Sequence, residues 1–520
     1  MSLERLGAPG TKDMVVGLMP GTDLQVHDIG AGAERCVRRA GVCRRGVHNR
    51  RFIASHSLWC HTPVMGRRPK QPNRQLEELV EEAGGVRKPL ARRVIDRGRS
   101  RGLELRYDHS SVGRWLAGEQ PQAPIPDLIA EVLTELLGRK ITPAMCGLRV
   151  SPEATADLGL EFALNLSDAV DAATALWRSD VEHRRFLQDT SYAVAVYPAA
   201  SMRWLTLPGP EHPVSNRSSR RVGQTDVDAV QTMATAFRDL DNKVGGGKVR
   251  LTIVQYLHSS VSPLLRGSFT ENIGRQLFGS TAELARLAGW AAYDKEDHGL
   301  AQRYLIQALR LARGAGDTSL GAEIMAAMSH QATYVGRPGD AVDLARAAQI
   351  ATRGTGLAAL ESECHMVEAH GHAAREDRSA CLAALTAAER AFDRADRTHR
   401  PDWLVYFDEA YLSAKIAHCF RELGDDRRTA QFAEQALKMS QGYKRGRAFN
   451  LALFASALVP TDPREAVTIG HEALTIATDL ASRRSLSYLR DLRYRLGPYG
   501  SIGEVADFRQ QVLELTNRSD

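Results

Sequence analysis

Apolar residues recur at helical spacing in five short segments of the N-terminal third of the chain. In the first segment Leu76, Leu79 and Val80 lie on one face, and in the second Leu90 and Val94 do so. The segments cover residues 73–85, 88–98, 108–118, 126–138 and 142–148. The spacing predicts five helices, of which the last is short.

The third segment has a distinct outer face. Asp108 is a good N-cap residue, and Gly118 favours a C-terminal stop. Val112, Trp115 and Leu116 stand at i, i+3 and i+4 and share an apolar face, so Trp115 is predicted to be a core residue. The opposite face is small, polar and cationic, as suits a helix that enters a DNA major groove.

In the C-terminal half, small residues recur at i, i+4 and i+7 in five units. The units are Ala301/Leu305/Ala308, Ala341/Ala345/Ala348, Ala380/Ala384/Ala387, Thr429/Ala433/Ala436 and Ala466/Gly470/Ala473. Another helical segment precedes each stripe, for example 281–293, 320–336 and 403–424. Smooth stripes let a neighbouring helix approach closely. We therefore expect paired helices over about 281–485 and a capping helix at 501–515.

The intervening region is less regular. Residues 192–198 alternate, which is weak evidence for a strand, and residues 178–187 resemble a solvated segment. Residues 226–265 predict two helices broken at glycines 245–247. The glycines precede Lys248 but lack the spacing of a phosphate-binding loop, so we interpret them as a helix break.

Composition and charge narrow the class of protein. No run of about 18 apolar residues exists, so we expect no membrane span. Seven cysteines without a CxxC pair indicate no disulfide framework and favour a reducing cytoplasm. The net charge is +5 over residues 65–150 and −3 over 151–520. The positive field thus coincides with the segments that would face DNA.

The first 64 residues carry a net charge of +4 and lack periodicity. Their cysteines and histidines match no zinc-ligand spacing, and no apolar core of a signal peptide is present. We expect residues 1–64 to be disordered if they are made. We also expect Met65 to be the natural start, so that residues 1–64 are an upstream extension. A peptide from this segment in the native protein would contradict the second expectation.

The helix order, together with Ser111, Arg114, Trp115, Gly118 and Pro121, resembles the Cro/C1-type (XRE) helix-turn-helix domain. The loop before the third helix is longer than the family's usual turn. The paired helices resemble tetratricopeptide repeats, although their period exceeds the usual 34 residues.

With these two parts, the run 222–247 resembles a segment of streptomycete regulators of differentiation and antibiotic production. That resemblance covers roughly residues 65–490. It implies a negatively acting transcription factor.

The helix-turn-helix resemblance implies which side chains touch DNA. Base-reading positions would be His109, Ser110 and Arg114. Phosphate contacts would be Arg67, Arg68, Lys70, Arg87, Lys88 and Ser111. Arg114 can bind guanine O6 and N7 together. Two alternatives stay open: His109 could pack inward toward Val112, and Ser111 could serve the helix start instead of a phosphate.

The sequence therefore predicts an all-α protein. Its parts would be residues 1–64, a Cro/C1-type five-helix DNA-binding domain at 65–150, a helical linker at 151–280 and a tetratricopeptide-like α-solenoid at 281–520. We expect a cytoplasmic, nucleoid-associated repressor that binds double-stranded DNA as a homodimer.

A peptide, protein or small-molecule effector could occupy the repeat groove. The alternative function is a tetratricopeptide-type scaffold that binds protein and not specific DNA. No catalytic motif or cofactor-binding motif is present, so no enzyme activity is expected. His365, His370 and His372 are a metal site or, more commonly, groove-lining residues.

Overall fold

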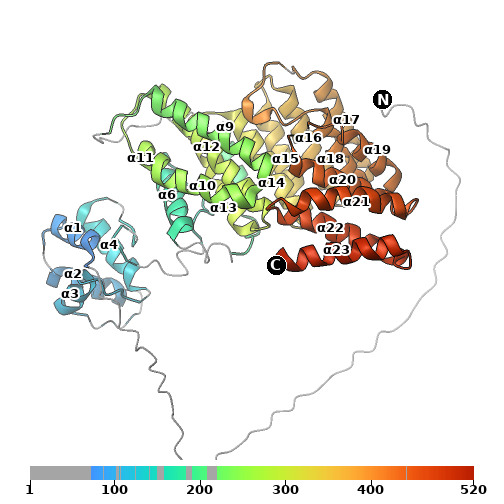
Figure 1. The fold of residues 1–520 in the computed structure, drawn as a ribbon. Coiled ribbons are helices and arrows are strands. Elements are labelled where there is room, and N and C mark those ends of the chain that lie inside the picture. The colour runs from blue at the N-terminus through green and yellow to red at the C-terminus, as the bar shows by residue number, and fades with distance from the viewer. Residues whose placement is uncertain are drawn as a thin grey trace, which may run out of the picture. The chain divides into compact units, whose positions relative to one another are not determined.

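The computed structural model divides the chain into two compact units, residues 1–120 and 121–520 (Figure 1). It describes residues 72–85, 87–100, 103, 105, 107–122, 124–139, 141–143, 145–148, 157–182, 190–207, 220–396, 398–440 and 442–519. In that part of the chain the regular structure is helical, apart from one isolated bridge between Arg221 and Ser268, so the predicted all-α class is confirmed. No described helix combines the length and apolar character that a membrane span requires. The predictions for residues 1–64 lie outside the described residues.

The first unit contains three helices, α1 (Arg74–Glu82), α2 (Arg87–Arg99) and α3 (His109–Leu116). Asn73 begins α1, because its side chain accepts a hydrogen bond from the Leu76 amide at 3.1 Å. The buried apolar side chains are Leu76, Leu79, Val80, Leu90, Ala91, Val94, Val112, Trp115 and Leu116. The apolar faces that the sequence predicts for these helices are confirmed.

The second unit begins with α4 (Ile125–Leu137), which ends at Gly138 in the left-handed conformation, as predicted. The predicted fifth helix at 142–148 is wrong. Its described residues form a single turn, in which the Cys146 amide donates to the Thr142 carbonyl at 3.2 Å. Gly147, at φ +60°, stops that turn.

Between α4 and the hairpins, the described residues form six further elements. They are α6 (Leu166–Glu182), α8 (Val196–Thr206), α9 (Gln224–Val244), α10 (Gly246–Tyr256), a π-helical turn η2 (Leu257–Val261) and α11 (Ser262–Leu265). The predicted helix break is confirmed, because Gly245 separates α9 from α10 with φ +84°.

The predicted strand in this region is wrong. Residues 192–198 form no strand: Ala195 adopts φ +67°, which ends any extended run, and α8 starts at the next residue. Of the segment 178–187, predicted to be solvated, the structure describes 178–182. Val181 and Glu182 are exposed, but Asp180 is fully buried and forms an ion pair with Arg250 of α10.

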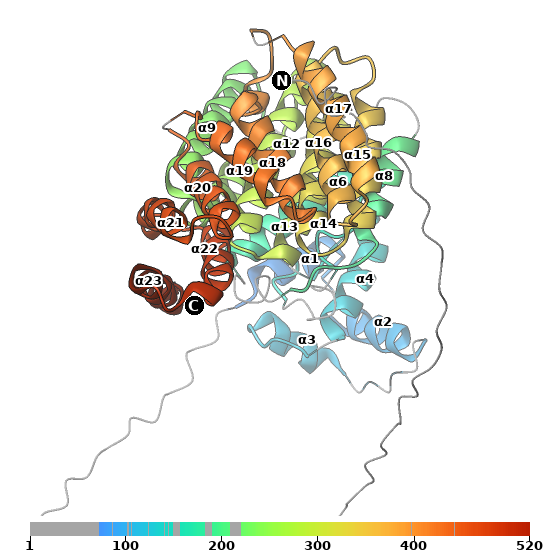
Figure 2. The ribbon, with the colours of Figure 1, turned by 90° about the vertical axis from the view of Figure 1, so that its right-hand side faces the viewer.

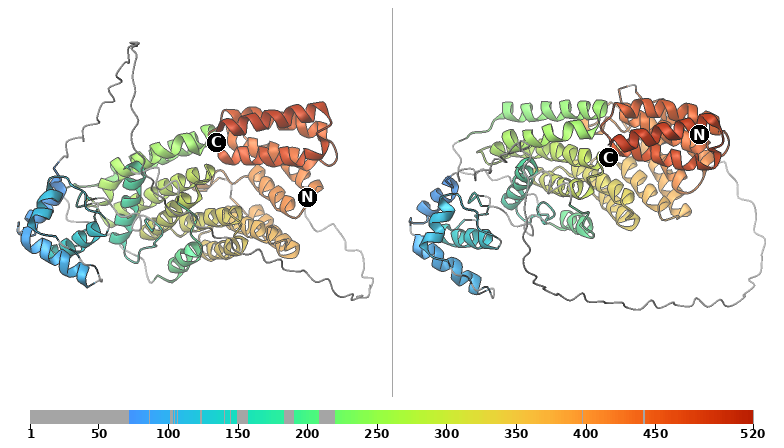
Figure 3. Two further views of the ribbon diagram at one scale, coloured as in Figure 1. Left: turned by 90° about the horizontal axis from the view of Figure 1, so that it is seen from below. Right: turned by 60° about the horizontal axis from the view of Figure 1, so that its bottom comes forward.

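Five antiparallel helical hairpins follow. They are α12 (Glu271–Asp294) with α13 (His298–Ala315), α14 (Thr318–Tyr334) with α15 (Pro338–Thr352), α16 (Ala358–Ala373) with α17 (Arg378–Asp393), α18 (Glu409–Glu422) with α19 (Asp426–Ala436), and α20 (Lys444–Leu458) with α21 (Pro463–Thr478). Successive hairpins pack side by side in a solenoid-like stack (Figures 1 and 3). The sequence thus predicted all five pairs.

The register of the third pair differs by one residue from the prediction. Ala380 and Ala387 are half-buried, whereas Cys381, Leu385 and Ala388 are fully buried. Asp377 caps α17 through the Ala380 amide at 3.0 Å. Counting from this cap, the buried stripe falls at the same places as in the other pairs.

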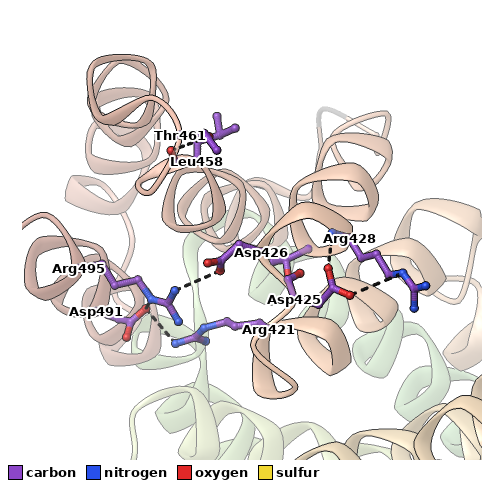
Figure 4. Close-up of polar contacts among 9 residues, drawn as sticks. Arg421, Asp425, Asp426, Arg428, Leu458, Thr461, Asp491 and Arg495 are labelled. Carbon is purple, nitrogen blue, oxygen red and sulfur yellow. Dashed lines mark hydrogen bonds and ion pairs between the residues drawn. The ribbon is translucent and has the colours of Figure 1, made fainter. Parts of the chain in front are cut away.

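Two more helices follow the hairpins, α22 (Arg483–Arg495) and α23 (Gly503–Ser519). The sequence predicted the second as a capping helix and missed the first. Polar contacts attach α22 to the fourth hairpin (Figure 4). Asp491 Oδ2 accepts from Arg421 Nη2 at 2.9 Å and from Arg495 Nε at 3.2 Å, and Arg495 Nη1 lies 3.5 Å from Asp426 Oδ1.

The glycines at 245–247 also permit a close backbone contact that the sequence did not predict. The Gly247 amide donates to the Ala481 carbonyl at 3.0 Å, and the Ala481 amide donates to the Val244 carbonyl at 3.2 Å. A Cβ on Gly247 would lie 2.6 Å from the Ala481 oxygen, so only glycine permits this approach. Helix α9 therefore lies against both α12 and α20 (Figure 2), and the stack of hairpins closes on itself.

Candidate functional site

Helix α3 of the first unit begins with a reciprocal capping box. Asp108 is extended, its Oδ1 accepts from the Ser111 amide at 3.0 Å, and the Ser111 hydroxyl accepts from the Asp108 amide at 3.4 Å. The Ser110 hydroxyl donates to the same Oδ1 at 2.6 Å. At the other end Gly118, with φ +93°, follows the C-cap. The predicted start and stop of this helix are both confirmed.

The inner face of α3 is the predicted apolar face. Val112 is fully buried, and Trp115 is 2% exposed. The Trp115 ring lies 5.4 Å from the Tyr107 ring, centroid to centroid, at a tilted angle. Such packing contributes beyond buried area and holds a short helix at a fixed angle. Trp115 is therefore a core residue, as predicted.

The outer face carries the three predicted base-reading side chains. His109, Ser110 and Arg114 are all exposed. Of the two alternatives for His109, the structure favours the outward one, because the ring is not packed beneath Val112. Arg114 Nη2 lies 3.2 Å from the Ser111 hydroxyl, which leaves the rest of its fork open to solvent. A guanidinium, a hydroxyl and an imidazole thus share one accessible surface.

Ser111 itself is 3% exposed, and its hydroxyl is used within the capping box. This placement fits the helix-start alternative that the sequence left open.

The carboxylate of Asp108, which caps α3, also sets the charge at the start of this helix. Hydrogen bonds from the Ser110 hydroxyl and then from the Ser111 amide lower the pKa of Asp108 to about 2, so it is ionised at neutral pH. An anion already occupies this N-terminus, which disfavours a phosphate there.

Helix α2 supplies a second set of cations. Arg87 and Lys88 open the helix and are exposed. Arg87 Nη1 lies 3.9 Å from the place where a Cβ on Gly113 would stand, so its guanidinium lies alongside α3. Arg67, Arg68 and Lys70 lie outside the described residues.

The prediction overlooked the density of charge on α2. Besides Arg87 and Lys88, this helix carries Arg92, Arg93, Arg97 and Arg99. The only acidic residue in it is Asp96, which pairs with Arg99 at 3.3 Å. The composition of residues 87–99 would have shown this surplus. Arg87 lies beside α3, and the surplus of positive charge on α2 is of the kind that attracts phosphate.

Two of the three histidines of α16 lie near Glu368, and the third does not. His365 Nδ1 lies 3.8 Å and His372 Nε2 lies 3.6 Å from the Glu368 carboxylate. The His370 ring instead lies between His330 and His418, 6.0 Å from each. Across the part of the chain that the structure describes, no group of three or more His, Cys, Asp or Glu side chains could hold a metal ion.

Comparison with known proteins links the N-terminal helices to one family. Residues 76–149 match the family model of the SP15 N-terminal domain, a match that begins within α1 and extends beyond α4. It covers a minor part of the chain. No curated protein matches this sequence.

Proposed function

We propose that this protein is a sequence-specific DNA-binding transcriptional regulator in which α2 and α3 act as a Cro/C1-type helix-turn-helix. The observation that carries the proposal is the division of α3 into two faces. Trp115 and Val112 fix the helix from behind, while His109, Ser110 and Arg114 remain exposed. A helix of this width fits the major groove, and Arg114 supplies the fork that reads guanine.

The basic side chains of α2 would provide contacts that do not depend on sequence. Arg87 stands beside α3, so a phosphate bound there would set how deeply α3 enters the groove. One such helix gives limited specificity. We therefore propose a homodimer that places two copies of α3 in successive major grooves, about 34 Å apart.

The resemblance to streptomycete regulators extends the proposal to a biological role. It supports a cytoplasmic, nucleoid-associated protein that represses genes of differentiation or secondary metabolism. In that reading the five hairpins are tetratricopeptide-like repeats that hold two chains together or sense an effector. The hairpin stack alone would equally suit the second candidate, an interaction scaffold whose N-terminal helices bind protein.

A binding experiment separates the two candidates. DNA selected from a random pool with the full-length protein gives an operator, whose affinity is compared with that of random DNA by fluorescence anisotropy. Arg114→Ala is expected to lose about 1–3 kcal/mol of preference for the operator while non-specific binding persists. Arg87→Ala should weaken binding to every sequence and reduce the salt slope by about one.

Arg353→Ala is a matched control, because this arginine is exposed but belongs to the second unit. It should change neither quantity. If no sequence is enriched, or if Arg114→Ala weakens specific and random DNA equally, α3 does not read bases. The scaffold would then be the better description.

A further inference from the structure

The closed stack of hairpins surrounds a cavity of about 440 Å³. The first helices of the hairpins line it together with α9, α22 and the segments before α18 (402–408) and before α20 (439–443). Arg445 of α20 bridges to α9 across the closure, with Nη2 2.8 Å from Asp241 Oδ2, and both side chains are buried. The cavity has the volume of small-molecule sites, which typically span about 300–1,000 Å³.

Most charges in this wall neutralise one another. Arg445 is matched by Asp241, and Arg286 Nη1 lies 3.2 Å from Glu323 Oε1. Arg238 forms an ion pair with Glu283. Buried pairs of this kind carry no net charge toward a ligand. Asp239, Asp402 and Asp408 also line the cavity, and Asp408 caps α18 by accepting from the Tyr411 amide at 2.8 Å. Two lining cations, Arg484 and Lys415, form no ion pair with a carboxylate of the described residues, and they are the places where an anion would bind.

Arg484 of α22 is the first of these two cations. It is 5% exposed, and its guanidinium carbon lies 4.3 Å from the Tyr293 ring centroid and 4.8 Å from that of Phe449. Among the described residues it forms no ion pair, although the buried Asp294, 3.6 Å from Arg445 Nη1, also acts on it, and its Nε has no hydrogen-bond partner. The aromatic rings contact the flat faces of the guanidinium, so its N–H groups remain available to a ligand that accepts hydrogen bonds.

Lys415 of α18 is the second lining cation without an ion-pair partner. Its Nζ lies 2.7 Å from His330 Nδ1. Burial holds the pKa of His330 well below its usual value, so the ring is neutral and accepts from the ammonium. Lys415 forms no ion pair within 4.0 Å among the described residues; burial lowers its pKa to about 8, and the nearby carboxylates of Glu363 and Glu323 partly oppose that shift.

A buried acid with an unsatisfied oxygen lies close to Lys415. Glu363 of α16 is 4% exposed, its Oε1 accepts from the Tyr411 hydroxyl at 3.4 Å, and its Oε2 has no partner. Burial raises the pKa of Glu363 to about 7. A carboxyl that is partly protonated at neutral pH can donate a hydrogen bond and cannot cancel both cations.

We propose that this cavity binds a small organic carboxylate with a planar ring. Its carboxylate would pair with the free edge of Arg484, in the bidentate geometry that guanidinium favours, with Lys415 adding charge. The ring would pack against aromatic side chains of the wall, among them Trp290, Tyr406 and Tyr488. The proposal does not depend on whether the first unit binds DNA.

Isothermal titration calorimetry on the full-length protein tests this with benzoate, 2-naphthoate and indole-3-acetate as probes. The matching amides have the same shapes without the charge. At least one acid should bind with 1:1 stoichiometry and at least ten times more tightly than its amide. The proposal is overturned if none of the acids binds saturably, or if the amides bind as well.

Variants locate the site. Arg484→Met should weaken the acid at least tenfold and leave the amide unchanged, while Arg484→Lys should fall between. Arg483→Gln is the matched control, because Arg483 is the neighbouring arginine of α22 and is exposed. Lys415→Met gives an independent second test should Arg484→Met prove poorly folded by circular dichroism. Unchanged acid affinity in a folded Arg484→Met protein, or in Lys415→Met if the first variant fails, would refute the assignment.

Discussion

Removal of the buried ion pair between α6 and α10 should reveal how strongly the second unit depends on it. Asp180 is fully buried and Arg250 is 1% exposed. Tyr304 of α13 also donates to Asp180 Oδ2, at 2.8 Å. Arg250→Met would leave the carboxylate buried without its counter-charge. We expect a loss of about 3–5 kcal/mol of unfolding free energy, the usual cost of such a broken pair.

The double variant is the informative one. Asp180→Leu alone would leave a buried guanidinium and should also cost about 3–5 kcal/mol. With Arg250→Met added, neither charge remains, and only the Tyr304 hydroxyl lacks its partner, at about 1–3 kcal/mol. Asp180 Oδ1 and Arg250 Nη2 already have no hydrogen-bond partner, so replacing both residues forfeits little else. The double variant should thus be more stable than either single variant.

The assay is urea denaturation of the full-length protein, followed by far-ultraviolet circular dichroism. This signal is dominated by the second unit, which holds most of the described helices. The unfolding of the first unit is followed separately, because two units need not unfold together. If the two single losses simply add in the double variant, the desolvation argument is refuted.

Three further predictions concern other parts of the molecule. The pKa of Glu363 is higher in the folded state than in the unfolded state, so the folded protein keeps this proton to higher pH. The unfolding free energy should therefore fall by about 2–3 kcal/mol as pH rises from about 4.5 to 7. Glu363→Gln should remove that fall in a series of melts at different pH. Asp108→Ala removes a cap worth about 1 kcal/mol, so amide hydrogen exchange in α3 should speed up about fivefold, and unchanged exchange would contradict the capping role. Gly321→Ala would place a Cβ 2.1 Å from Trp204 Cζ2 and should cost about 1–3 kcal/mol by thermal denaturation, which Trp204→Leu should partly restore.

The features that the sequence predicts well are local. Asp108, Trp115 and Gly118 define α3 because a cap, an apolar stripe and a left-handed stop act within one or two turns. The hairpins were predictable for a related reason. Their stripes repeat, and each helix packs mainly on its neighbours in sequence.

The register of the small-residue stripes and the contacts between distant segments were harder to predict from the sequence. The third stripe was misplaced because Ala380 and Cys381 are both small, and only the cap at Asp377 distinguishes them. Asp180 reads as a surface residue because its partner, Arg250, is far away in the sequence.

The cavity was beyond prediction for the same reason. Arg484, Lys415 and Glu363 come from three different helices. Each looks ordinary in its own segment. Only the curvature of the stack brings them to one wall, and that curvature is set by the packing of every hairpin together.

The contact between the glycine run and the residues after α21 also bears on how the chain is synthesised. Lys248 Nζ donates to the Asp479 carbonyl, and these residues are 231 positions apart. A ribosome must therefore produce almost the entire polypeptide before the two ends of the stack can meet. Until then the interior of the stack is open to solvent along one side. A truncated protein without residues 224–247 would lack α9, and its stack of hairpins would stay open.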